Sequence, residues 1–176
     1  MKKTCLLFCL FLIGSIVTGC GYSVRSSSLG RGKTIYIQPL KNKINYEAEN
    51  TRNIYLPLLE VNLTNAIVDR FLFDGTLRIA NKDKANFILQ GELIGYQRDP
   101  LRYDENNNIQ EYRITITVSM TLWDNVQQKP LWSEPSFSGD TTYFTSGSLA
   151  KTESSAIKDA LTDVARRIVE RTIEDW

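Results

Sequence analysis

Ser148 and Lys151 have the spacing of a nucleophile and its activating base. In penicillin-binding proteins, a Ser-x-x-Lys pair stands at the start of a helix, and the lysine lies one turn after the serine. The companion motifs Ser-Asp-Asn and Lys-Thr-Gly are missing from this chain. We therefore interpret Ser148 as the N-cap of a C-terminal helix, where its hydroxyl accepts a backbone hydrogen bond.

Histidine is absent from the whole sequence. This removes the commonest general base and the commonest transition-metal ligand, and it excludes Ser-His-Asp and Cys-His catalysis. Carboxylate pairs such as Asp104 with Glu105 fall in polar stretches, whereas glycosidases need two carboxylates across a cleft. We expect no enzyme, no metal site and no cofactor.

Cys20 carries the strongest chemical signal in the chain. A positively charged start precedes an apolar run over residues 5–17, which is shorter than the roughly 20 residues of a membrane-spanning helix. This arrangement is typical of a secretory signal peptide. The run ends in Val17, Thr18, Gly19 and Cys20, the pattern at which bacterial lipoproteins are cleaved. We predict cleavage before Cys20 and attachment of diacylglycerol to its thiol.

The lipid and the residues beside it predict where the protein is held. A diacylglycerol together with an N-linked acyl chain such as palmitate anchors a protein firmly, whereas one chain does not. Gly21 stands where an aspartate would favour retention in the inner membrane. We therefore expect the periplasmic side of the outer membrane. Removal of the signal peptide lowers the Lys+Arg count from 21 to 19, against 20 acidic residues, which argues against nucleic-acid binding.

Three segments follow along the chain: a signal peptide over residues 1–19, a lipidated tether rich in Gly, Ser and Arg over residues 20–32, and one domain over residues 33–176. Alternation and helical spacing predict the following elements of the domain: strands at 33–38, 76–80, 87–98, 111–123 and 130–143, and helices at 57–73 and 149–175. Residues 41–53 and 99–108 are predicted to be a loop and a turn.

This order of elements predicts an α+β fold, a two-layer sandwich with a mostly antiparallel sheet of about four strands and two helices packed on one face. Apolar residues alternate with Thr and Ser over residues 114–122, which indicates one buried and one wet strand face. Pro135 and Gly139 interrupt the last strand, and this favours a place at the sheet edge. An edge strand is also a natural site for pairing with another chain.

Basic residues near the predicted strand ends form a candidate binding site. Arg98, Arg102 and Arg113 lie near one turn, and Lys129 lies at another. Arginine suits bidentate contact with phosphate. Arg98, Arg102 and Lys129 are therefore candidate contacts for an anionic lipid headgroup, although ordinary solvated side chains explain the same residues.

Several short motifs occur in the order found in one family. They are residues 17–22 (VTGCGY), 35–42 (IYIQPLKN), 85–91 (ANFILQG), 95–96 (GY), 103–104 (YD), 111–114 (EYRI), 122–124 (LWD) and 131–132 (LW), followed by an alanine-spaced C-terminal helix. In this order the chain resembles the lipopolysaccharide-assembly lipoprotein family, LptE, over nearly all of its mature length.

The resemblance implies an outer-membrane lipoprotein that plugs and supports the assembly of a large β-barrel, which inserts lipopolysaccharide into the outer leaflet. It implies no catalysis. Cys20 matches the family's lipidation site, and the basic residues named above would contact lipopolysaccharide during export. The alternative is a lipoprotein adaptor or pilot for another envelope complex, such as a secretin.

Overall fold

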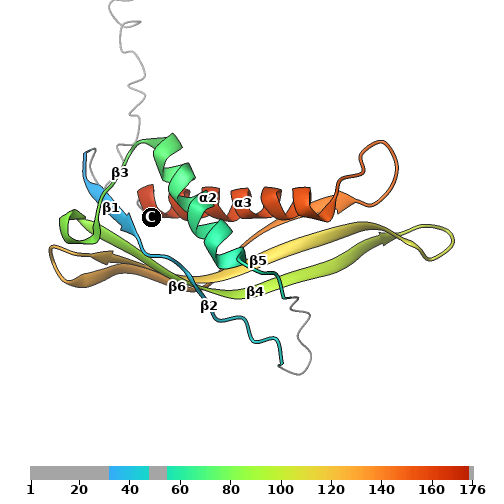
Figure 1. Cartoon of the computed structure of the whole chain (residues 1–176), viewed down its shortest axis with the longest axis horizontal. Helices are drawn as coiled ribbons and strands as arrows, with labels where there is room; N and C mark the ends of the chain where they lie inside the picture. The colour runs from blue at the N-terminus through green and yellow to red at the C-terminus, as the bar shows by residue number, and fades with distance from the viewer. Residues whose placement is uncertain (1–31, 48–54, 175–176) are drawn as a thin grey trace, which may run out of the picture.

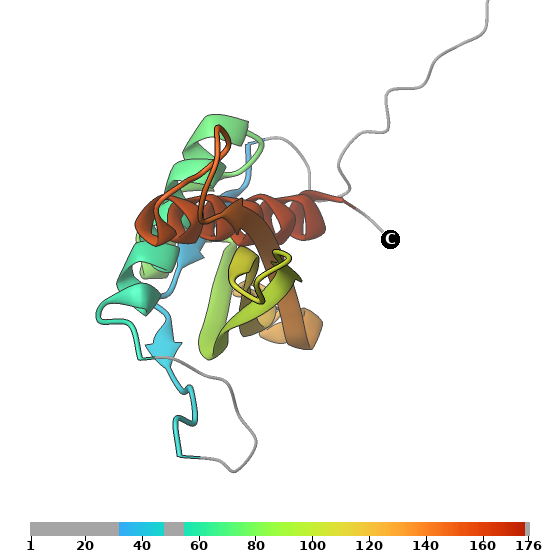
Figure 2. The same ribbon diagram turned by 90° about the vertical axis from the view of Figure 1, so that its right-hand side faces the viewer.

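The computed structural model describes residues 32–47 and 55–174 of the chain. In chain order the elements are β1 (Thr34–Ile37), β2 (Lys41–Asn42), α2 (Leu59–Asp74), β3 (Arg78–Ile79), the 3₁₀ helix η2 (Lys82–Lys84), β4 (Phe87–Tyr103), β5 (Ile109–Asp124), β6 (Lys129–Phe144) and α3 (Glu153–Ile173). The strands form one sheet, and both helices lie on the same face of it (Figures 1 and 2). The α+β class predicted from the sequence is confirmed.

The sheet is mixed and has six strands, more than the four expected. Its order is β3-β1-β4-β5-β6, and β2 pairs separately with β4. The long strands β4, β5 and β6 are antiparallel, whereas β1 runs parallel to β3 and β4. β2 and β3 have two residues each, which is too short to produce an alternating pattern. The predicted loop at 41–53 therefore begins with an undetected strand.

The predicted turn over residues 99–108 is wrong in its first half. β4 continues through Pro100 to Tyr103, and its register with β5 shifts between Pro100 and Arg102. Proline is tolerated in a strand at such an irregularity. The turn itself begins at Asp104, whose Oδ1 accepts hydrogen bonds from the backbone N–H groups of Asn106 and Asn108 at 2.9 and 2.8 Å.

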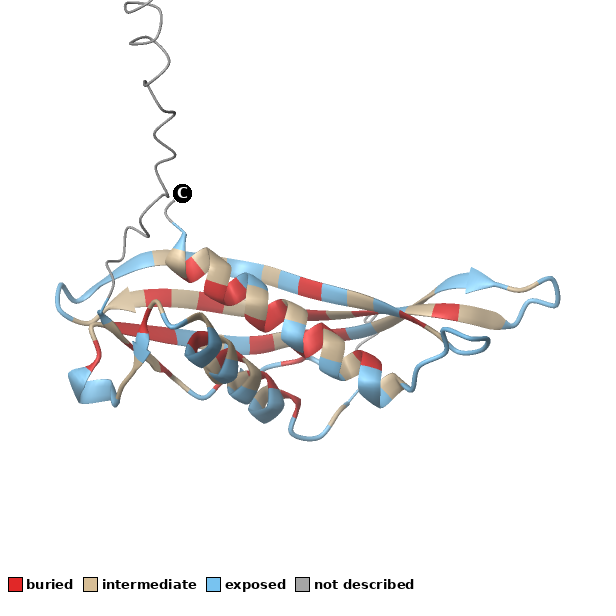
Figure 3. Ribbon diagram, turned by 90° about the horizontal axis from the view of Figure 1, so that it is seen from above, coloured by how far each residue is buried: buried red, intermediate tan, exposed pale blue. Residues whose placement is uncertain are grey.

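The core lies between the sheet and the helices, as the burial colours of Figure 3 show. The alternation predicted for β5 is confirmed, since its apolar side chains are buried: Ile114, Ile116, Val118, Met120 and Leu122. α2 contributes Leu59, Leu63, Ile67 and Phe71 to this core. α3 contributes mainly alanines and branched residues: Ala156, Ala160, Leu161, Val164, Ala165, Ile168 and Val169.

α3 lies directly against β6, which is the edge strand as predicted. A Cβ added to Gly139 would stand 2.8 Å from the backbone N of Val164, so glycine permits this close approach. Asp163 then accepts a hydrogen bond from the backbone N–H of Asp140 at 3.2 Å. α3 therefore covers part of the sheet edge that would otherwise be free to pair.

The start of α3 differs from the prediction. The helix begins at Glu153, and its N-cap is Thr152, whose side chain accepts a hydrogen bond from the Ser155 N–H at 3.2 Å. Ser148 therefore lies before the helix and is not its cap. Lys151 also precedes the helix and pairs with Asp159 at 2.9 Å. An N-cap needs its residue directly before the first helical turn, and Ser148 lies four positions before Thr152.

The molecule is elongated and has two distinct ends (Figure 1). The anchor end is where β1 begins, and it also contains β3, η2 and the β5–β6 turn. The far end contains the β4–β5 turn and the start of α3. No helix in the described part of the chain combines the length and the apolar character needed to cross a bilayer.

Candidate functional site

A cluster of aromatic and charged side chains surrounds Arg98 near the far end. The Arg98 guanidinium forms an ion pair with Glu153 in the first turn of α3. It also lies 4.9 Å from the ring centroid of Tyr112, and this ring stacks on Tyr143 with centroids 5.7 Å apart. Since the guanidinium has both a carboxylate and a ring as partners, Arg98 ties β4 and β5 to α3.

Tyr96 completes this cluster below the helix start. Its hydroxyl donates a hydrogen bond to Glu153 at 3.4 Å, and the residue is fully buried. Burial raises the pKa of the Tyr96 hydroxyl, and the negative charge of Glu153 raises it further. The pKa of Tyr143 is raised for the same reasons. Both tyrosines therefore stay neutral at physiological pH, and they place no negative charge beside Arg98.

Arg102 lies closer to the β4–β5 turn than Arg98 does. Its Nε is 3.6 Å from the Glu111 carboxylate, and its guanidinium lies 5.6 Å from the ring centroid of Phe144. The side chain remains 61% exposed, so its other N–H donors are open to a ligand. Arg113 pairs with Asp140 at 3.6 Å and is half exposed. The far end therefore holds three arginines, each with a carboxylate partner.

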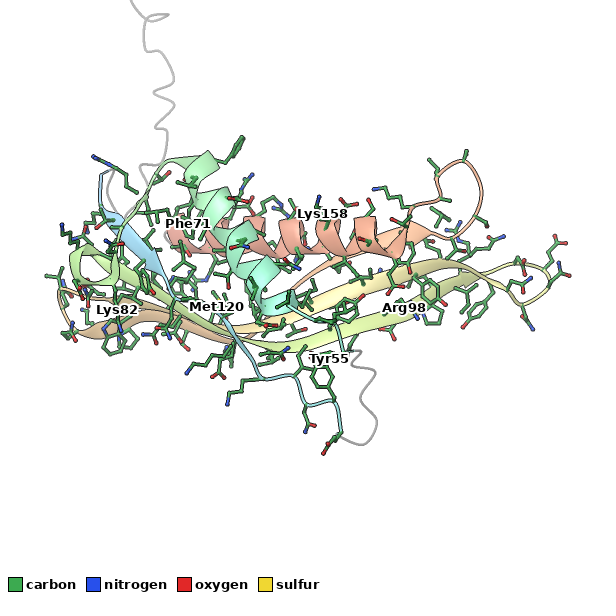
Figure 4. All side chains as sticks on the ribbon, viewed as in Figure 1. Tyr55, Phe71, Lys82, Arg98, Met120 and Lys158 are labelled. Atoms are coloured by element: carbon green, nitrogen blue, oxygen red, sulfur yellow. The ribbon has the colours of Figure 1, made fainter. Side chains whose placement is uncertain are left out.

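Lys129 lies at the opposite end from Arg102. In the strand register, Arg102 is opposite Glu111 of β5, and Lys129 is opposite Asp124 of β5. Arg102 and Lys129 are therefore on the order of 40 Å apart along β5. Figure 4 shows the same division between labelled Arg98 at one end and Lys82 at the other. The structure brings Arg98 and Arg102 together but leaves Lys129 with the lysines of η2. Lys129 therefore lies at a different turn from the two arginines, as the sequence predicted, and any contact of these residues with a headgroup would be made at two separate places.

A shallow groove between α3 and β6 was not predicted from the sequence. It has a volume of about 600 Å³. Its lining alternates in charge: Glu134, Phe137, Arg166, Arg167, Glu170, Arg171 and Glu174. Arg166 pairs with both Asp163 and Glu170 at 2.6 Å, and Arg171 pairs with Glu134 at 3.2 Å. Arg167 pairs with Asp163 at 2.8 Å. Because carboxylates already pair with all three of these arginines, the groove offers little net positive charge to an anion.

Asp163 contributes to the contact between α3 and β6. Burial raises the pKa of its carboxyl, but hydrogen bonds from Arg166 and from the Asp140 N–H, together with the charge of Arg167, lower it more. The net result is a pKa below the usual range, so the carboxylate is charged at neutral pH. These residues therefore stabilise the contact between α3 and β6.

Metal-binding clusters of three or more His, Cys, Asp or Glu side chains do not occur among the described residues. Cys20, the predicted lipidation site, lies outside those residues, as do the predicted signal peptide and most of the tether. The described chain therefore places the basic candidates and leaves the lipidation site and the domain boundaries as predictions.

Two solved structures with TM-scores above 0.5 share the fold of this chain. Protein XCC0632 from Xanthomonas campestris aligns with a TM-score of 0.54 and 16% identity, covering 80% of this chain and 83% of its own. Protein CT253 from Chlamydia trachomatis aligns with a TM-score of 0.56 and 11% identity, covering 80% and 95%. Rare lipoprotein B from Shewanella oneidensis gives a TM-score of 0.44 and 16% identity, covering 78% and 92%.

No curated protein sequence matches the chain. A family model described as "LptE: Lipopolysaccharide-assembly" matches residues 32–172, which include every helix and strand of the described structure except the last residue of α3. This match agrees with the order of motifs from the first β-strand to the C-terminal helix. The chain therefore belongs to the LptE family of lipopolysaccharide-assembly lipoproteins.

Proposed function

We propose that this lipoprotein plugs the β-barrel that inserts lipopolysaccharide into the outer membrane, and that it supports the assembly of that barrel. The observation that carries the proposal is the family match over residues 32–172. In this proposal Cys20 bears the lipid, residues 20–32 form the tether, and residues 33–176 act as one domain. The protein binds and positions its partner and catalyses no reaction.

The uncovered face of the sheet suits the inside of a barrel. Both helices lie on one face, and the other face of β5 carries Thr115, Thr117, Ser119 and Thr121 between the buried apolar positions. The Thr121 and Ser133 hydroxyls are hydrogen-bonded at 2.9 Å across β5 and β6. The interior of an outer-membrane barrel is polar. Hydroxyl groups can donate and accept hydrogen bonds, so the Thr and Ser residues of β5 can form hydrogen bonds with such a wall. Glu92 of β4 lies opposite Ser119 and adds an exposed carboxylate to the same face.

The two ends of the molecule favour one direction of insertion. The chain leaves the tether at Gly32 and enters β1 at the anchor end, so the far end is the part remote from the lipid. Arg98 and Arg102 lie toward that far end and would meet phosphorylated lipopolysaccharide inside the barrel. Lys129, at the anchor end, would meet anionic headgroups at the rim.

Recovery of the lipidated protein from detergent-solubilised outer membranes, followed by mass spectrometry, tests the proposal. We expect a stoichiometric large β-barrel whose yield depends on this protein. A Thr117→Arg variant places a charge on the uncovered face and should reduce barrel recovery. The same substitution at exposed Thr162 on α3 is the matched control and should leave recovery unchanged.

The result that would overturn the proposal is equally specific. Recovery of a secretin, or of no barrel, would favour the alternative of a lipoprotein adaptor or pilot. Equal loss from Thr117→Arg and Thr162→Arg would mean that the sheet face has no special role in binding.

A further inference from the structure

The outward side of α2 carries large apolar side chains at both of its ends. Leu58 and Val61 are exposed at the start of the helix, and Leu72 and Phe73 are exposed at its end. Phe73 is the most exposed of them at 81%, and Leu72 is 63% exposed. Figure 3 shows the outward side of α2 in the colour of exposed residues. The exposed residues between these ends are polar: Asn62, Asn65 and Asp69. A surface helix normally presents polar residues outward, so the exposed pair at the C-terminal end of α2 is the part that departs from this pattern.

The start of β1 lies at the same end of the molecule as the C-terminal end of α2 (Figure 1). The Lys33 carbonyl, at the entry to β1, accepts a hydrogen bond from the Arg78 N–H at 3.0 Å. Arg78 begins β3, and Gly75 between it and α2 is the helix C-cap. The chain from Cys20 therefore enters the domain within a few residues of the exposed end of α2.

The length of the tether limits how far this end can lie from the membrane. The segment from Cys20 to Gly32 spans at most roughly 40 Å when fully extended, and about 19 Å on average if it behaves as a flexible Gly- and Ser-rich chain. A lipid on Cys20 would thus hold the end of α2 close to the leaflet surface at a high effective concentration. At such an effective concentration, even a weak apolar contact between the end of α2 and the leaflet is sufficient for the bound state to be populated.

The charges around the exposed end suit a lipid headgroup layer. Basic residues outnumber acidic ones at the anchor end. Five exposed basic residues lie there, Lys33, Arg78, Lys82, Lys84 and Lys129, against Asp74, Asp83 and Asp124 in the same segments. The Arg70 guanidinium lies 5.3 Å from the ring centroid of Phe73. Long basic side chains can cover apolar surface while their charged groups stay with water and phosphate. A ring that inserts beside such an arginine has the chemistry of an interfacial helix.

We propose that α2 lies on the periplasmic surface of the outer membrane, with Leu72 and Phe73 inserted among the lipids of the leaflet that holds the acyl chains of Cys20. This inference rests on the proposed lipidation of Cys20. It is compatible with the barrel plug, because the far end can enter the barrel while the anchor end stays at the rim.

A single-cysteine experiment tests the contact in the mature, lipidated protein. Cys5 and Cys9 leave with the signal peptide and the Cys20 thiol carries lipid, so the mature chain should have no free thiol. Phe73→Cys and Lys158→Cys each introduce one thiol for an environment-sensitive fluorophore. Lys158 lies on the outward side of α3 (Figure 4) and is the matched control. Each labelled protein is reconstituted in vesicles with and without brominated phospholipids.

We expect the probe at position 73 to shift to the blue and to lose most of its emission with brominated lipids, while the probe at position 158 remains unquenched. An unquenched probe at 73 would overturn the proposal. A blue shift without quenching would mean that protein, such as a second copy, covers α2, and this would overturn it as well. Labelling of the parent protein would show that Cys20 is not lipidated. The barrel recovery experiment is independent of all these outcomes.

Discussion

α2 and α3 pack on the same face of the same sheet, but their outward sides differ in chemistry. The outward side of α3 carries paired charges. Arg166 pairs with Glu170, and Asp159 pairs with Lys151, which lies just before the helix. The outward side of α2 exposes Leu72 and Phe73 instead. Because each helix buries its own apolar inward side in the same core, the fold does not require this difference between the outward sides. It indicates that α3 faces water and that α2 faces another partner.

The largest expected effect comes from truncating the inward side of either helix. Leu63 and Ile168 are buried in the core, so Leu63→Ala and Ile168→Ala should each lower the free energy of unfolding by about 2–5 kcal/mol. Leu72→Ala, on the outward side of α2, should change it by no more than about 0.5 kcal/mol. Urea unfolding monitored by circular dichroism measures all three. A large loss from Leu72→Ala would mean that its side chain stabilises the domain itself.

The next effect concerns the close approach of α3 to β6. Gly139→Ala should lower the free energy of unfolding by about 1–3 kcal/mol, because the new Cβ would stand 2.6 Å from Val164 Cγ2. Ser138→Ala, one residue earlier in β6, is the control. Thermal unfolding of both variants provides the comparison, and equal melting temperatures would show that α3 can move away from β6 without cost.

A smaller effect is expected from the carboxylate that joins α3 to β6. The pKa of Asp163 is lowered in the folded protein. The charged carboxylate therefore contributes to stability above the unfolded pKa of about 3.9. This contribution is lost as the pH falls through the lower pKa of the folded state. Asp163→Asn should therefore reduce stability at pH 7 by about 1 kcal/mol. The difference in the free energy of unfolding between the variant and the parent should disappear in strong acid. A gap that stays constant with pH would assign the loss to packing.

The smallest effect at neutral pH is expected from Tyr96→Phe, because its hydrogen bond to Glu153 is long at 3.4 Å. The pKa of Tyr96 is raised in the folded state, so its contribution is fully present below the unfolded pKa of about 10. It is lost as pH rises through the higher folded pKa. The parent should therefore lose more stability than the variant above about pH 10, as measured by unfolding at several pH values. If the parent and the variant lost the same stability as the pH rises, this would contradict the claim that burial raises the pKa of Tyr96.

Local patterns predicted the elements that can be recognised without their neighbours. The alternation of β5 and the helical spacing of α2 are set by side chains a few residues apart, and Gly75 has the positive φ of a C-cap at 73°. The parallel pairing of β1 with β4 joins residues about fifty positions apart, and no local pattern encodes it. The sequence contains the exposed residues Leu72 and Phe73 of α2, but the helical spacing of apolar residues predicts only the side of the helix that faces the core.

The candidate site was predictable in its residue types and not in its arrangement. Arg98 and Arg102 lie on one strand near one turn, as their closeness in sequence predicted. Lys129 was placed at a different turn, and the length of β4 and β5 puts that turn at the other end of the sheet. The role of these residues as headgroup contacts stays a prediction. Thr152 replaced Ser148 as the helix N-cap because several residues there can cap a helix, and tertiary packing selects one.

The position of β1 also determines how the domain responds to force on its lipid anchor. β1 lies between β3 and β4, and it is held by backbone hydrogen bonds from Ala80 to Ile35 at 3.0 Å and from Gln38 to Leu89 at 2.9 Å. A pull transmitted through Gly32 acts along this strand, so it loads the hydrogen bonds on both sides together in shear. Force on the N-terminal end of the domain therefore has to break several hydrogen bonds at once, and it does not peel the domain open one bond at a time.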